Sequence, residues 1–425
     1  MNDAHILTAI ENTLRGPMAN SHMDEFGPDA RLNEDLHLDS VLLLHLLLHL
    51  ETIHGVEVPE REMSKSGIGT VRDLTAFLMG RSIAPETDDE EEIDIKVHCV
   101  VSCLSAAIKA CPGLDHRPFY FGVWDTGFEV DDAYRLSYHG PSVKHDHFRH
   151  WFRRLYGVNV IGWYNKDQTK AENIARFERL LANKRSTEHL MVMLDMYHLP
   201  ERENKFNQNP FPHYVMIEKT PDADRWFMHD PDYRWEGVLA RTTILHAIAQ
   251  PTVAGGYIFD RAEARAPRDE DLRAYFEAVF LEKRNPMIDA TRQIVRAHLD
   301  PAEPLDHTDL AQALRELPVL AIRKYAYEHG FAVFWRALGL PDQEFEEWCD
   351  EIEALHQGFR SLQYKITKLS ASGDPALAAQ VFSALDVLDQ RETQIKAGLK
   401  AWFVKWQVST FASGEVALVM TGADQ

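Results

Sequence analysis

The sequence predicts a multidomain protein of the α and α+β class, and three observations support this fold class. Residues 1–81 show apolar residues at helical spacing and predict a helical bundle. In residues 93–262, short β-rich runs mix with helical stretches, which is typical of an α+β domain. Residues 263–425 are almost entirely helical in pattern and predict an all-helical domain. The acidic, proline-containing run 82–92 predicts a linker behind the first domain.

Length and composition narrow the class of protein. A chain of 425 residues is too long for one ordinary core, and its 45% hydrophobic and 26% charged residues indicate a folded globular protein. It has no run of eighteen apolar residues and no basic segment followed by an apolar one at the N-terminus, so we expect neither a membrane partner nor a secretory signal. Four cysteines are too few for a disulfide framework, and we expect a cytoplasmic protein.

The negative charge is concentrated at the N-terminus. Of the net charge of −21, residues 1–92 carry −13 and the remaining residues carry −8. Nucleic-acid binding requires concentrated positive charge, so we expect no nucleic acid as a partner. A small acidic domain beside a milder body instead predicts a module that docks onto basic patches of partner enzymes.

Individual elements follow from the local patterns. Helical spacing predicts the N-terminal helices, the central helices and the C-terminal helices at 5–16, 39–51, 71–79, 99–110, 145–156, 269–299, 310–329, 344–369 and 375–407. Runs rich in β-branched and aromatic residues predict strands at 93–97, 159–164, 190–196, 214–218, 226–229 and 256–259.

The first chemical motif is Asp39-Ser40, which stands before the very apolar helical stretch 41–51. Asp39 is a favourable N-cap, and it places Ser40 in the first helical turn. A phosphodiester on that hydroxyl would lie where the helix amides and dipole favour negative charge. The alternative is that Asp39 and Ser40 only cap a helix, as such pairs usually do.

This segment resembles acyl and peptidyl carrier proteins, in which the serine of an Asp-Ser-Leu-like motif receives 4′-phosphopantetheine. The likeness extends to Asn33–Leu36, Gly55–Pro59 and Thr70–Leu74, while Val41 replaces the usual leucine. The resemblance implies a four-helix carrier bundle over residues 1–81, with the cofactor bound covalently to Ser40. It also implies two partners, a phosphopantetheinyl transferase and an adenylating or acyl-loading enzyme.

The second motif combines a cysteine, a histidine and an aspartate. Cys99 begins a predicted helix, where a thiol gains thiolate character that suits a nucleophile. His213 begins a buried strand, and Asp230 ends the next apolar run. If the two strands are antiparallel neighbours, Asp230 lies beside His213 and can orient its imidazole while His213 activates Cys99.

The order Cys, His, Asp resembles papain-like folds, and more closely the N-terminal domain of butirosin biosynthesis protein H. That family acylates an aminoglycoside with a group delivered as a carrier-protein thioester. The resemblance covers roughly residues 95–255 and rests on His98-Cys99, on 121–128, on Asp195–Pro200 and on His213–Asp230. It implies a papain-like α+β domain over 93–262, with Cys99, His213 and Asp230 as catalytic residues.

Several details depart from that pattern. The related peptidases have a glutamine before the cysteine, whereas residues 93–98 contain none, so His98 and the Cys99 amide are both candidates for the oxyanion site. Trp124, Asp195 and Tyr197 are candidates for the pocket lining. Cys103 is an alternative nucleophile or a packing residue. The cysteine spacing does not favour a metal site.

Together these features predict a carrier-dependent acyl or aminoacyl transferase of secondary metabolism, such as siderophore or antibiotic biosynthesis. The acyl group would pass from the Ser40 arm through Cys99 to a small amine or hydroxyl acceptor. Two rivals remain, namely a thioesterase or cysteine peptidase-like hydrolase, and a non-catalytic protein that docks carriers.

Overall fold

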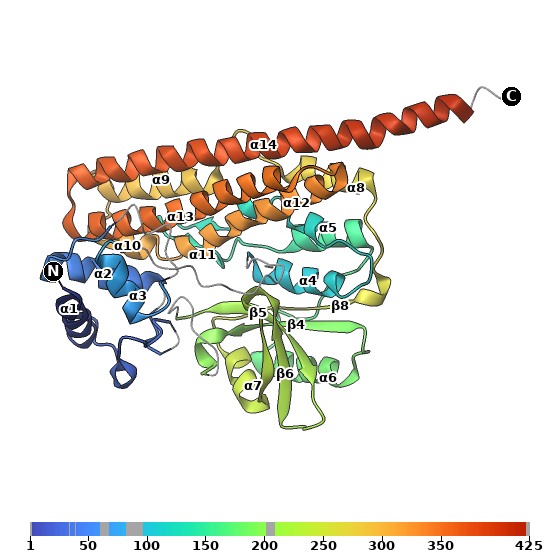
Figure 1. Ribbon diagram of the computed structural model, residues 1–425. Helices are drawn as coiled ribbons and strands as arrows, with labels where there is room; N and C mark the ends of the chain where they lie inside the picture. The colour runs from blue at the N-terminus through green and yellow to red at the C-terminus, as the bar shows by residue number, and fades with distance from the viewer. Residues whose placement is uncertain are drawn as a thin grey trace.

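The computed structural model of the chain has three regions, which Figure 1 shows from blue at the N-terminus to red at the C-terminus. A helical N-terminal region precedes a central region with a sheet, and long helices form the C-terminal region, as the sequence predicts. Among the residues that the structure describes, no helix is both long and apolar enough to cross a membrane. The structure describes residues 2–33, 35–38, 40–59, 68–81, 97–200 and 209–421.

The N-terminal region contains α1 (Asp3–Arg15), the 3-10 turn η1 (Met23–Glu25), α2 (Ser40–His54) and α3 (Val71–Leu78). Thr70 starts α3 with a reciprocal capping box to Asp73. The apolar side of α2 is buried in a cluster with residues of α1 and α3. Of the predicted four-helix bundle, three α-helices lie among the described residues. Residues 60–67, Asp39 and the predicted linker 82–92 lie outside them.

The central region is built on a six-stranded sheet in the order β3-β8-β4-β5-β6-β7, in which all neighbouring strands are antiparallel. Five of these six strands lie where the sequence predicts strands. Of the sixth predicted strand, 93–97, residues 93–96 lie outside the described residues and Val97 is not in a strand. The sequence pattern did not predict β7. This strand lies at the edge of the sheet, and Leu239 is its one buried residue. The strands are β3 (Ile161–Gly162), β4 (Glu188–Asp195), β5 (Pro212–Lys219), β6 (Arg225–Asp230), β7 (Trp235–Ala240) and β8 (Gly256–Asp260).

Helices cover both faces of this sheet (Figure 1). On one face lie α4 (Cys99–Lys109) and α5 (Asp146–Tyr156), which share an apolar cluster with Tyr214 and Met216 of β5. On the other face α6 (Lys170–Asn183) and α7 (Arg241–Ala249) pack with Val215 and Ile217 of the same strand. Because side chains alternate along a strand, β5 is buried on both sides and forms the centre of the region.

The C-terminal region is helical, but two of its predicted helices are interrupted. The predicted helix 269–299 is divided by residues 280–285, where Pro286 starts a new helix, and 310–329 is divided near Pro318. The observed helices are α8 (Asp269–Val279), α9 (Pro286–Leu299), α10 (Leu310–Ala313), α11 (Leu317–Ala321), the 3-10 turn η9 (Ile322–Tyr325), α12 (Ala326–Leu338), α13 (Asp342–Ser372) and α14 (Pro375–Thr421).

The central and C-terminal regions share one interior. A single apolar cluster extends from Val97 before α4 to Trp406 in α14. A buried ionic network also joins them, because Lys324 of η9 contacts both Asp125 of the central region and Glu392 of α14. Lys396 Nζ completes the network, at 2.7 Å from Asp125 Oδ2. Two cations and two carboxylates balance one another, so each buried charge has a partner.

Candidate active site

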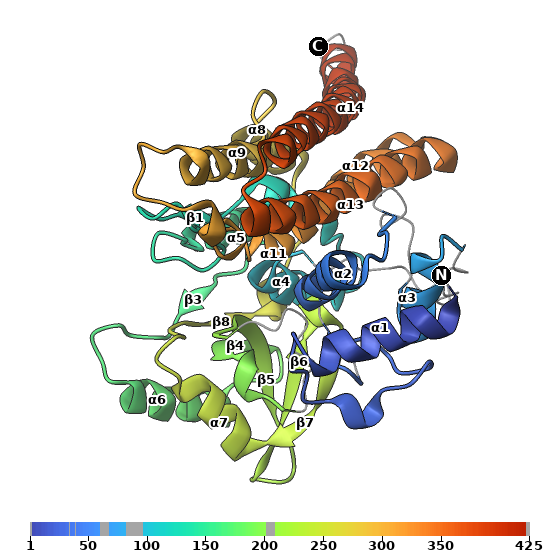
Figure 2. The same ribbon diagram turned by 90° about the vertical axis from the view of Figure 1, so that its left-hand side faces the viewer.

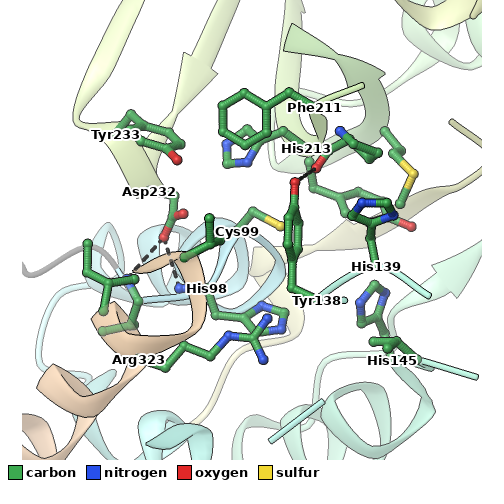
Figure 3. Close-up of a pocket in the computed structure, with 17 residues that line it drawn as sticks. His98, Cys99, Tyr138, His139, His145, Phe211, His213, Asp232, Tyr233 and Arg323 are labelled. Carbon is green, nitrogen blue, oxygen red and sulfur yellow. Dashed lines mark hydrogen bonds between the residues drawn. The ribbon is translucent and has the colours of Figure 1, made fainter. Parts of the chain in front are cut away.

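A small cavity of about 90 Å³ lies between the central and C-terminal regions. Figure 3 shows that its walls come from the start of α4, the loop after the short strand β2 (Leu136–Ser137), the start of β5, the turn after β6, and η9. It meets a wider groove of about 1060 Å³, and His145 and Tyr214 line both. The residues lining the cavity are Val97, His98, Cys99, Tyr138, His139, Val143, His145, Met193, Phe211, Pro212, His213, Tyr214, Asp232, Tyr233, Val319, Ile322 and Arg323.

Cys99 is the first residue of α4 and is half-buried. The helix amides at this position have no intrahelical partner, so the local dipole favours negative charge on the sulfur. Asp232, from the turn η6 (Pro231–Tyr233), holds the helix start. Its Oδ1 accepts a hydrogen bond from the His98 amide at 3.0 Å (Figure 3). The same oxygen accepts a hydrogen bond from the Ser102 hydroxyl at 2.7 Å. The half-buried Asp232 carboxylate therefore fixes the backbone that carries Cys99.

His213 stands at the start of β5 and Asp230 at the end of β6, the neighbouring antiparallel strand. His213 Nε2 lies 2.9 Å from Asp230 Oδ1, and both side chains are buried. Cys99 lines the same cavity as this imidazole. Burial lowers the pKa of His213, but the charge of Asp230, its hydrogen bond to the ring and the neighbouring Cys99 outweigh burial, so the pKa is raised well above its usual value.

Arg323 brings a positive charge into the cavity from η9 of the C-terminal region (Figure 3). Its Nη1 donates hydrogen bonds to the carbonyl oxygens of Thr126, at 2.5 Å, and Gly127, at 2.9 Å. Its Nε and Nη2 have no hydrogen-bond partner, and no carboxylate lies within 4 Å, among the described residues. The adjacent Lys324, by contrast, is fully paired.

The surroundings of Arg323 are consistent with a site for negative charge. Burial lowers the pKa of the guanidinium to about 10, while Cys99, Asp232 and Tyr138 act in the opposite direction. The group therefore remains a cation at neutral pH. A buried cation without an ion pair is costly unless negative charge forms beside it. This position of Arg323 therefore suits an anion in the cavity.

Two neutral imidazoles, those of His98 and His145, line the cavity together with Arg323. Burial, Arg323 and His145 hold the pKa of His98 well below its usual value, and burial together with Arg323 lowers the pKa of His145 to about 4. His98 Nδ1 is buried and has no hydrogen-bond partner among the described residues. Neither ring competes with Arg323 for negative charge, so the guanidinium is the cation of this wall.

The structure gathers some of the predicted site residues and places others elsewhere. Cys99, His98 and His213 line the cavity, and Asp230 lies behind His213. Trp124 is buried away from the cavity and stacks on Tyr327 at 4.4 Å. Cys103 is buried, and its thiol lies 3.6 Å from the Tyr214 carbonyl oxygen.

Asp195 and Tyr197 are likewise not among the residues that line the cavity. Asp195 Oδ1 accepts a hydrogen bond from the Phe211 amide at 2.8 Å, and thus fixes the backbone just before β5. The Tyr197 side chain is 46% exposed. In the N-terminal region, Ser40 is the first residue of α2, so it lies in the first helical turn as predicted.

Sequence reasoning missed Asp232, Arg323, Tyr138 and His145. Asp232 had a visible signal, since it stands two residues after Asp230 in the turn that ends β6. Arg323 had none, because an arginine in a helical segment usually belongs to a solvated face. His145 begins the predicted helix 145–156, which gave no sign of a site residue, yet it precedes α5 and lines the cavity.

Removal of the Asp232 carboxylate tests how the start of α4 is held. We expect Asp232→Ala to lower the free energy of unfolding by about 1–3 kcal/mol, because buried donors lose their acceptor. Asp232→Asn keeps an acceptor oxygen and is expected to lose less. Urea unfolding measures both, with the exposed Asp222→Ala as the control. Equal stability of Asp232→Ala and the control would contradict this role.

Comparison with known proteins relates the central and C-terminal regions to the two domains of one family. Residues 94–264 match the model of the DUF6005 N-terminal domain, and residues 270–418 match that of the DUF6005 C-terminal domain. The petrobactin synthase of Bacillus anthracis is 39% identical over 313 residues, which cover 74% of this chain and 96% of that protein.

Two acyl carrier proteins are also similar to a short part of the chain. The one from Streptomyces coelicolor is 29% identical over 83 residues, covering 20% of this chain and 88% of that protein. The one from Helicobacter hepaticus is 36% identical over 55 residues, covering 13% of this chain and 70% of that protein.

Proposed function

Because this chain belongs to the same family as the Bacillus anthracis petrobactin synthase, we propose that it is a carrier-dependent acyltransferase of siderophore biosynthesis. The likeness to acyl carrier proteins supports a carrier domain at residues 1–81, followed by the linker 82–92. In this proposal residues 93–262 form a papain-like domain and residues 263–425 a helical one. The observation that carries the proposal is the hydrogen-bonded pair His213 and Asp230 beside Cys99 at the cavity.

Ser40 is the proposed attachment residue for 4′-phosphopantetheine, which a phosphopantetheinyl transferase adds and an adenylating or acyl-loading enzyme charges. When bound, this group supplies the thioester that carries the acyl group. In the first step His213 takes the thiol proton of Cys99, and Cys99 Sγ attacks the thioester carbonyl. His213 returns the proton to the leaving sulfur, and the acyl group remains on Cys99 as a new thioester.

An amine or hydroxyl acceptor completes the reaction. His213 accepts the proton of the acceptor as it attacks the acyl carbonyl, and then protonates the departing Cys99 sulfur. The free thiol is thereby restored, and the acyl group forms an amide or ester. Asp230 keeps His213 in the tautomer whose other nitrogen faces Cys99.

We assign the stabilisation of negative charge in both steps to Arg323. The thiolate of Cys99 and the carbonyl oxygen of each tetrahedral intermediate are the anions that form in this cavity. The buried guanidinium has nitrogens that make no other hydrogen bond among the described residues, and it needs no reorganisation during the reaction.

Replacement of Arg323 tests this assignment. We expect Arg323→Met to lower the transfer rate about a hundredfold, the usual size of an oxyanion contribution, and Arg323→Lys to recover part of the loss. We also expect iodoacetamide to alkylate Cys99 about tenfold more slowly in Arg323→Met at neutral pH. Arg391→Met, at a half-exposed arginine of α14, is the control. Unchanged alkylation and transfer in Arg323→Met would contradict the assignment.

The function itself is tested by a single-turnover assay on the acyl-loaded full chain. The loaded protein is mixed with small amines or alcohols, and the products are separated by mass. Acyl amide or ester that depends on the acceptor supports transfer. Release of free acid at the same rate with and without acceptor identifies water as the acceptor and the protein as a hydrolase.

A further inference from the structure

Among the described residues, the N-terminal region packs against α13 around Tyr364 and Lys368. Figure 2 shows α2 directly beside α13, and Figure 1 shows the same neighbourhood from the side. Tyr364 of α13 is fully buried and belongs to the apolar cluster of the N-terminal region. Among the described residues it is the one member of that cluster from outside residues 1–81.

Among the described residues, two side chains of α13 form polar contacts with the Glu51 carboxylate. Tyr364 donates its hydroxyl hydrogen to Glu51 Oε2 at 2.5 Å, and Lys368 Nζ lies 2.9 Å from Glu51 Oε1. The Lys368 ammonium also stands 5.3 Å from the centre of the Tyr364 ring. Both oxygens of Glu51 are thus recognised by a pair of residues one helical turn apart on α13.

The strength and position of this contact suit a temporary attachment. Glu51 and Lys368 remain 33% and 18% exposed, and ion pairs at such positions contribute little each. Glu51 is near the C-terminal end of α2, about 16 Å along the helix from Ser40 at a rise of about 1.5 Å per residue. The contact therefore involves the C-terminal end of α2, whereas Ser40, the proposed attachment residue, lies at the other end.

We propose that Tyr364 and Lys368 form a reversible docking site for the carrier domain of this same chain, and that the site recognises Glu51. The inference rests on the proposed carrier role of residues 1–81. Docking keeps the carrier close to the cavity and raises its effective concentration there. It also selects for a carrier with a carboxylate at this position of α2, since a lysine there would face Lys368.

Charge exchange across the contact provides the test. Hydroxyl-radical footprinting of the full chain measures the oxidation rate of Tyr364, which the carrier domain covers in the docked state. We expect Lys368→Glu and Glu51→Lys each to raise this rate about tenfold, because like charges meet. The double variant Glu51→Lys/Lys368→Glu restores the opposite charges, and we expect it to return the rate to that of the unaltered chain.

Two references make the result decisive. Glu57→Lys applies the same charge change at an exposed position of the N-terminal region and is expected to leave Tyr364 protected. Tyr327, which is buried inside the C-terminal region, reports whether a variant is folded, and Glu51→Gln replaces any variant in which Tyr327 becomes reactive. Protected Tyr364 in the single variants, or a double variant as reactive as they are, would overturn the proposal. Because footprinting needs neither the arm nor transfer, failure of the docking site and failure of the acyltransferase function are distinguishable.

Discussion

Replacing Cys99 by alanine is expected to lower acyl transfer by at least about a thousandfold, the loss that follows removal of a catalytic nucleophile. Without the sulfur at the start of α4, no acyl group can be passed from the arm to a thioester at the cavity, although His213 and Asp230 keep their contact. Cofactor attachment at Ser40 is expected to continue normally, since it takes place in another domain. A single-turnover assay with an amine acceptor measures the loss.

Cys103→Ala is the matched control for this prediction. Cys103 lies one turn further along α4, but its thiol is fully buried against the Tyr214 carbonyl, and burial raises its pKa well above the usual value for a thiol. We therefore expect Cys103→Ala to retain transfer within a few-fold. If Cys99→Ala were still active and Cys103→Ala were not, Cys103 would be the nucleophile.

Ser40→Ala is expected to abolish transfer of a group supplied by the loading enzymes, because it removes the hydroxyl that carries the cofactor. Intact-protein mass spectrometry after incubation with coenzyme A and a broad-specificity phosphopantetheinyl transferase measures the modification. The exposed Ser21 lies in the same region, and Ser21→Ala is expected to gain the full mass of the arm. An added mass on Ser40→Ala would show that another residue holds the cofactor.

Local patterns were sufficient for the residues that begin helices and strands. Ser40 and Cys99 each start a helix, and His213 lies at the start of β5, because helical spacing and short apolar runs of β-forming residues are visible within each segment. The position of Asp230 follows from the pairing of two consecutive antiparallel strands, which is the simplest connection a sheet allows. These residues needed no knowledge of the distant parts of the chain.

The rest of the site depends on contacts between segments far apart in the sequence. Arg323 reaches the cavity because η9 interrupts a stretch that the pattern predicts as one continuous helix. Its setting, a buried cation that has no carboxylate partner among the described residues, exists only after the central and C-terminal regions share their core. No spacing rule within one segment reports such an environment, so the structure was required to find it.

The same reasoning applies to the contact between the N-terminal region and α13. Glu51 has the appearance of an ordinary exposed helix residue in the sequence, and Lys368 that of a solvated lysine. Only the position of Tyr364 inside the apolar cluster of the N-terminal region shows that these residues belong to one surface.

The most direct test of the account follows the acyl group itself on the full chain, without an acceptor. The protein is loaded with an acyl group on the Ser40 arm, quenched in acid and digested, and the peptides that contain Ser40 and Cys99 are weighed. We predict that the acyl mass appears on the Cys99 peptide of the unaltered chain and stays on the arm in Cys99→Ala. Complete retention of the acyl group on the arm of the unaltered protein, followed by acceptor-dependent product without any acyl-Cys99, would contradict the proposed route through Cys99.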